Sequence, residues 1–144
     1  MTDALNVIMR CLHIISVVVL IGGVLFARLV IVPALEPLAP KDRESLGESM
    51  AARYRSLLYL SILLLLGTGI YNLFMNLGRG PVYHALLGIK LLLALHVFAV
   101  GMLIVKPKNE KRTRQMTGLV ISGVTIVAIS AVLRQIHLSQ IQIH

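Results

Sequence analysis

Two side chains in strongly apolar surroundings could do chemistry, His13 and Lys90. His13 lies about a third of the way into the apolar run 10–26, and Lys90 lies within a second apolar run, 82–105. An imidazole carries protons and ligates metals, whereas an ammonium group binds anions. Either group is costly in hydrocarbon, so each is expected to face the inside of a helix bundle and to have a partner there.

Two further side chains could act as ligands beside this pair. Met9 lies one turn before His13 on the same helix face, and a thioether with an imidazole suits copper or haem iron. His96 lies six residues after Lys90, which is about 240° around a helix, so the two residues point to different faces. We therefore do not expect Lys90 and His96 to ligate the same atom.

Several other chemistries are excluded by the residue types. The sequence has no phosphate-binding glycine-rich loop, no GxSxG, no HExxH and no CxxC, and its one cysteine, Cys11, forms no disulfide framework. The acidic residues all lie outside the apolar cores; they are Asp3, Glu36, Asp42, Glu44, Glu48 and Glu110. A carboxylate-based pathway for protons or cations through the molecule is therefore not expected.

The elements that must position His13 and Lys90 are membrane-spanning helices. Of the 144 residues, 57% are hydrophobic, and the mean hydropathy is +0.85, which is typical of an integral membrane protein. The first apolar run is too long for the core of a removable signal peptide. Helices are predicted at about 4–32, 40–76 (membrane part from 55), 82–105 and 113–138. The first is expected to end at Pro33.

The net charge of +8 reports membrane orientation and does not indicate nucleic acid as a partner. Basic residues flank two connections: Arg28, Lys41, Arg43, Arg53 and Arg55 the first, and Lys106, Lys108, Lys111, Arg112 and Arg114 the second. The opposite side holds only Arg10, Arg79 and Arg134. Basic loops face the cytoplasm, so both termini are predicted to lie outside it, in the bacterial inner membrane.

The short connections predict an all-α fold, an up-down-up-down four-helix membrane bundle forming one domain over residues 1–144. The lipid bilayer is the expected environment, and a homo-oligomer is compatible with the sequence.

Depth along the helices brings the candidate residues together. His13 is about nine residues from the outer surface, or roughly 13 Å at 1.5 Å per residue. The same depth on the third helix falls near Lys90, and on the second near Gly67, Thr68 and Gly69. We expect the missing side chains of Gly67 and Gly69 to leave room for a flat ligand in this layer.

Simpler interpretations stand beside this one. Glycines in membrane helices usually allow close helix contact, which applies to Gly22-Gly23 and to Gly67 and Gly69. His13 could only tie two helices together, and Lys90 could extend toward the outer interface.

Several motifs resemble those of a known family. Residues 12–18 (LHIISVV), with Gly23 and residues 26–29 (FARL), resemble the first helix of the bacterial membrane-embedded protoporphyrinogen oxidase family. Residues 88–93 (GIKLLL) resemble its third helix, where HxKL is usual; Gly88 replaces that His, and the Trp expected after the first-helix His is missing. The chain also resembles the related copper-resistance protein D (CopD) domain, at residues 22–23, 33–35, 53–55, 68–71 and 89–91.

The resemblance implies a function for the pair. In the oxidase family a first-helix His and a third-helix Lys act together and haem b is bound, which places His13 and Lys90 in those roles. The expectation is a haem-dependent oxidoreductase that acts on a porphyrin or a quinone, with Met9, His96, Gly67 and Gly69 near the cofactor. The CopD branch implies the alternative, copper binding or transport at the cytoplasmic membrane, for which Met9, His13 and His96 or Met102 are suitable ligands. A third hypothesis is a non-catalytic membrane subunit.

Overall fold

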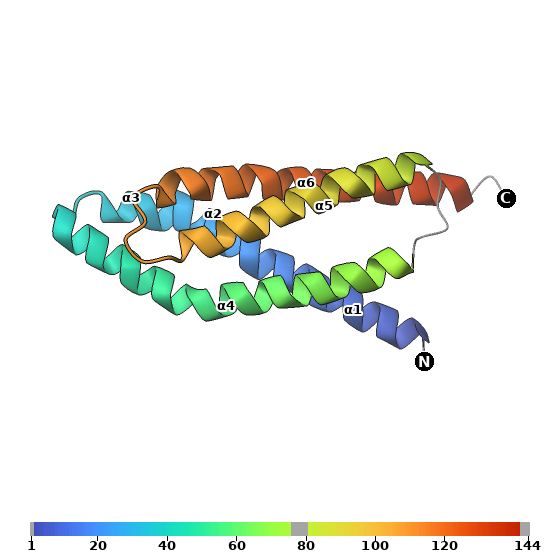
Figure 1. Cartoon of the computed structure of the whole chain (residues 1–144), viewed down its shortest axis with the longest axis horizontal. Helices are drawn as coiled ribbons and strands as arrows, with labels where there is room; N and C mark the ends of the chain where they lie inside the picture. Colours follow the sequence, from blue (N-terminus) through green and yellow to red (C-terminus); the bar gives the residue numbers. More distant parts are fainter. Residues whose placement is uncertain (1, 76–80, 142–144) are drawn as a thin grey trace.

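The computed structural model describes residues 2–75 and 81–141, which form helices and turns without any strand (Figure 1). Four helices in this part of the chain are long and apolar enough to cross a membrane; they cover Ala4–Leu35, Pro40–Phe74, Tyr83–Ile104 and Arg112–Gln135. The prediction of an all-helical protein with four membrane-length helices is therefore confirmed.

The first membrane-length helix consists of five consecutive helical segments. They are α1 (Thr2–Val17), the π-helical turn η1 (Val18–Gly22), α2 (Gly23–Phe26), the π-helical turn η2 (Ala27–Ile31) and α3 (Val32–Leu35). The predicted end at Pro33 is wrong, because the helix continues to Leu35. A π turn loosens the usual backbone hydrogen bonding, and η2 ends at Ile31, two residues before Pro33, so the proline ring is accommodated in the first turn of α3.

The other three helices are continuous. They are α4 (Pro40–Phe74), α5 (Pro81–Ile104) and α6 (Arg112–Ile141). Pro40 and Pro81 open α4 and α5, where a missing backbone N–H costs no helical hydrogen bond. The polar first part of α4 therefore joins its apolar part without a break.

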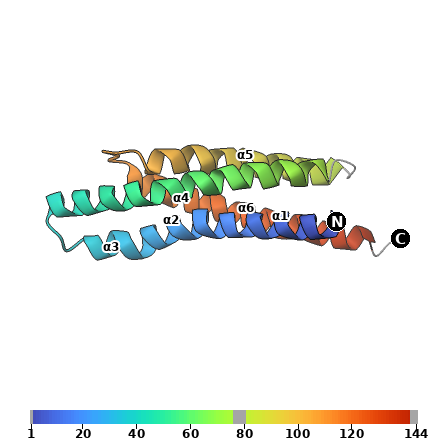
Figure 2. The same cartoon turned by 90° about the horizontal axis from the view of Figure 1, so that it is seen from below.

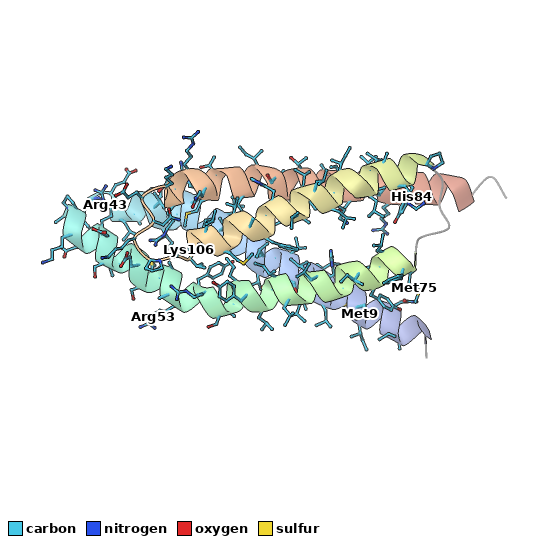
Figure 3. The ribbon with its side chains drawn as sticks, in the orientation of Figure 1. Met9, Arg43, Arg53, Met75, His84 and Lys106 are labelled. Carbon is cyan, nitrogen blue, oxygen red and sulfur yellow. The ribbon has the colours of Figure 1, made fainter. Side chains whose placement is uncertain are left out.

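The four helices run side by side in two layers (Figure 2). α1 packs along α4 and α5 packs along α6, while α2 contacts α6 and α4 contacts α5. α1 begins and α6 ends at one end of the bundle, here called the terminal end (Figure 1). The connections 36–39 and 105–111 lie at the other end, the basic end. Figure 3 shows Arg43, Arg53 and Lys106 there, and Met9, Met75 and His84 toward the terminal end.

The buried core lies along the middle of the bundle and toward the basic end. Its fully buried members come from all four membrane-length helices and include Leu20, Leu58, Val97 and Leu119. Much of the outer surface is also apolar, and Leu92, for example, is 71% exposed. Lipid tails are as apolar as leucine, so such surfaces are stable in a bilayer and costly in water.

The basic end is fastened by side chains that cap α5. The carbonyl groups of residues 103–106 accept hydrogen bonds of 2.8–3.0 Å from Arg55, Asn109 and Arg112. Two of these donors are cationic, which also suits the negative end of the helix dipole. The arginines that mark orientation in the sequence therefore hold this end of α5 as well.

Candidate functional site

The side chain of His13 forms a hydrogen bond that crosses from α1 to α4. Its Nδ1 lies 2.7 Å from Oγ1 of Thr68, which is buried, whereas the imidazole is half-buried. Thr68 is in the layer that the depth argument assigned to His13. The sequence analysis located Thr68 at this level but did not identify it as the partner of the imidazole.

The surroundings of Thr68 determine which way this hydrogen bond runs. Its hydroxyl group lies 2.7 Å from the carbonyl oxygen of Leu64, to which it donates its single proton. The hydroxyl oxygen must then accept a hydrogen bond from Nδ1–H of His13. In the neutral ring this leaves Nε2 with a free lone pair, the arrangement usual for a metal-ligating histidine.

The contact between α1 and α4 that carries His13 has further polar links. Tyr71 and Asn6 are joined by a hydrogen bond of 2.5 Å toward the terminal end. Toward the basic end, the hydroxyl of Tyr54 donates to the carbonyl of Val19 at 2.6 Å. The His13 hydrogen bond lies between these links along α4, so the polar contacts at both sides fix the register of the two helices.

Tyr54 is a residue whose role the sequence analysis missed. A Cβ added to Gly23 would lie 2.6 Å from the Tyr54 hydroxyl, so only glycine leaves room for the tyrosine ring. The hydroxyl reaches carbonyls in η1, where the π turn alters the backbone hydrogen bonding. A Cβ added to Gly22 would meet only Val18 of the same helix, at 4.0 Å. Gly23 thus makes room for a side chain, and Gly22 does not.

Lys90 of α5 is half-buried and lies within electrostatic range of His13. In residues 2–75 and 81–141 it forms no hydrogen bond or ion pair. Its cost in a bilayer, on the order of 2–3 kcal/mol on insertion scales, is therefore not offset by any carboxylate of the described chain. Lys90 is a cation available to a bound anion.

The other candidate ligands are divided by the structure. Met9 is half-buried on the face of α1 that carries His13, whereas His96 and Met102 are exposed on α5. Within the described residues, no group of three His, Cys, Asp or Glu side chains could hold a metal ion. Met9 is thus the one of these three that shares a half-buried face with His13.

The glycines of this layer border open space. A Cβ added to Gly67, Gly69 or Gly88 would meet no atom within 4 Å. Gly67 and Gly69 flank Thr68 in sequence, and Gly88 lies two residues before Lys90. Close helix contact therefore does not account for them, since each could carry a methyl group without collision.

Comparison with known proteins gives no match to a family model, to a curated protein or to a solved structure. The resemblance to the protoporphyrinogen oxidase and CopD families rests on the sequence motifs alone.

Proposed function

We propose that this chain is a four-helix protein of the bacterial inner membrane that binds haem b through His13. The helices cross the bilayer up-down-up-down with the basic end in the cytoplasm and both termini outside it. The function is electron transfer or the oxidation of a porphyrin or quinone-linked substrate. The motif resemblance to the oxidase family suggests this function, and the geometry around His13 supports it.

The observation that carries the proposal is the 2.7 Å contact between Nδ1 of His13 and the hydroxyl of Thr68, which itself donates to the carbonyl of Leu64. Because Nδ1 is the donor to Oγ1 at 2.7 Å, Nε2 is the nitrogen left to coordinate iron. A haem-ligating histidine requires this tautomer, in which Nε2 carries no proton.

The residues around His13 fit a haem in two respects. Haem carries two propionates, and Lys90 is a cation of this layer without an acidic partner in the described chain. A Cβ added to Gly67, Gly69 or Gly88 would meet no atom within 4 Å, so no neighbouring side chain fills these positions. Bound there, haem supplies one-electron chemistry that no side chain of this protein provides.

The chain itself would then hold and orient the cofactor and its substrate. Thr68 fixes the plane and tautomer of the imidazole, and Lys90 binds a propionate or a substrate oxygen. The apolar surfaces of α1 and α5 keep water away from the pair, which strengthens each polar interaction between them.

A second candidate function is copper binding of the CopD type. Met9 and His13 lie one turn apart on a half-buried face of α1, and thioether and imidazole ligands suit Cu(I). His96 and Met102 are exposed on α5, so this set reduces to two ligands from one helix.

The absorption spectrum and the metal content of the purified protein distinguish these functions. Protein from haem-replete cells should be red, with a Soret band and iron close to one per chain. Stoichiometric copper without a Soret band would favour the CopD-type function. Protein that contains neither cofactor, even after incubation with haem or Cu(I), would contradict both and leave a non-catalytic subunit.

A further inference from the structure

A cavity of about 430 Å³ lies at the basic end, away from His13 and Lys90. It lies between the first membrane-length helix at Val24 and Ala27 and α4 at Ala51 and Tyr54. The volume is in the range of cavities that hold small molecules. Its lining is almost entirely apolar, so it suits a hydrocarbon group.

The cavity opens on an exposed apolar surface of the bundle. Phe26, Met50 and Leu57 line it and are 57%, 42% and 53% exposed. An apolar chain can therefore enter sideways from the surrounding lipid without crossing water.

The charged groups of this cavity are all cationic. Arg53 and Arg112 line it, and no aspartate or glutamate does. Arg53 is exposed and makes no hydrogen bond or ion pair with the described residues. Arg112 donates hydrogen bonds to backbone carbonyls and likewise forms no ion pair with the described residues. An anionic group at the edge of the cavity would thus meet two cations, neither of which forms an ion pair with the described residues.

A second, more polar cavity of about 590 Å³ adjoins the first one. The two share Val32, Leu35, Gly47 and Arg112. Glu44, Glu48 and Glu110 line only this second cavity. The lining thus changes from the apolar cavity, past Arg112, which lines both, to the polar cavity, as polarity does along an amphiphile.

We infer that the apolar cavity holds an acyl chain of an anionic phospholipid, whose phosphate lies at Arg53 and Arg112. Entry of the chain gains little from the hydrophobic effect, because lipid tails already surround the protein. Selection must therefore come from the head group. One cation near a membrane surface contributes about a fivefold preference for an anionic lipid. This inference is independent of haem binding.

The test uses the full-length protein in nanodiscs of equal parts phosphatidylcholine and phosphatidylglycerol. Spin-labelled phosphatidylglycerol or phosphatidylcholine is added, and the motionally restricted fraction is measured by electron paramagnetic resonance. The charge variant is Arg53→Gln, with Arg114→Gln as its control, since Arg114 is exposed at the same end and lines neither cavity. The filling variant is Ala51→Phe. Its control is Ala52→Phe at the adjacent position, which is exposed and outside the cavity.

The wild type should restrict phosphatidylglycerol in preference to phosphatidylcholine. Arg53→Gln should reduce this preference about fivefold, and Ala51→Phe should remove the restricted lipid, while both controls behave as wild type. Equal restriction of the two lipids in the wild type would overturn the inference. So would identical behaviour of Ala51→Phe and Ala52→Phe, or recovery of a quinone in place of phospholipid from the cavity. If Ala51→Phe fails to fold, the comparison of Arg53→Gln with Arg114→Gln decides alone, because Arg53 is exposed and its replacement should not prevent folding.

Discussion

At the scale of single residues, the imidazole of His13 is controlled by the hydroxyl group of Thr68. The threonine hydroxyl donates a hydrogen bond to the Leu64 carbonyl of its own helix, so it accepts the hydrogen bond from His13. Such outer partners of a metal-ligating histidine typically contribute 10–100-fold to metal affinity. The hydroxyl and the imidazole are therefore expected to act as one unit.

Replacing Thr68 tests this coupling. Thr68→Val keeps the shape but removes the acceptor, so haem affinity should fall about 10–100-fold, with a shifted reduction potential. Thr68→Ser keeps the hydroxyl and should restore both values. Haem titration and potentiometry of the two variants provide the measurement. If valine and serine gave the same potential and affinity, the hydrogen bond would have only a structural role.

The role proposed for Lys90 is the part of the proposal that is easiest to refute. Lys90→Met removes a charge costing on the order of 2–3 kcal/mol in the bilayer, so the variant should be at least as resistant to unfolding in detergent. If Lys90 holds a propionate or a substrate oxygen, the same variant should lose haem or its redox activity. His96→Leu, at an exposed position of the same helix, is the matched control. A Lys90→Met protein with full haem content and activity would refute the role assigned to Lys90.

At the scale of the elements, the contact between α1 and α4 depends on Gly23 and Tyr54. The tyrosine donates to η1 carbonyls at 2.6 and 3.1 Å and occupies the space that a Cβ of Gly23 would need. The π turn, the glycine and the tyrosine are therefore parts of one arrangement.

Gly23→Ala should destabilise the bundle by about 1–3 kcal/mol, because the new methyl group displaces the Tyr54 ring. Gly22→Ala should be neutral or slightly stabilising, since open space surrounds it and alanine favours helix. Unfolding in mixed detergent, followed by circular dichroism, compares the two. In a Tyr54→Leu background the cost of Gly23→Ala should shrink. Equal effects at the two glycines would show that the tyrosine contact does not control this helix pair.

The sequence was informative where one regular spacing decides the outcome. The constant rise of a helix was enough to assign His13, Thr68 and Lys90 to one depth, and the structure joins His13 to Thr68 by a hydrogen bond. The number of membrane-length helices followed in the same way from apolar length.

Other features depend on packing between helices and could not be predicted. The π turns in residues 18–22 and 27–31 carry no sequence signal of their own, so the helix end was misplaced at Pro33. Identifying Thr68 as the partner of His13 requires the rotation of α4 about its axis, and depth along the helix does not give this rotation. The cavity at Arg53 needed the separation of the first helix from α4, which no motif reports.

At the scale of the whole molecule, the basic end and the terminal end differ strongly in charge. In the proposed topology, which follows the positive-inside rule, the basic end lies in the cytoplasm. This orientation sets which side of the membrane exchanges substrate with the His13 layer, since that layer is nearer the terminal end.

Single cysteines in a Cys11→Ala background test the orientation. Lys111→Cys at the basic end should react with a membrane-impermeant maleimide only after the cells are opened. Met75→Cys, exposed at the terminal end, should react in intact cells. The reverse pattern would overturn the proposed topology and leave the helix packing unaffected.

The central claim, that His13 holds a haem, is tested most directly by the Soret absorbance of one pair of variants. His13→Ala should lose the Soret band while the protein remains folded. His84→Ala removes an exposed imidazole near the terminal end and should keep the band at wild-type intensity. Addition of free imidazole should partly restore the band in His13→Ala, because it supplies the missing nitrogen ligand. An unchanged Soret band in folded His13→Ala would contradict the claim.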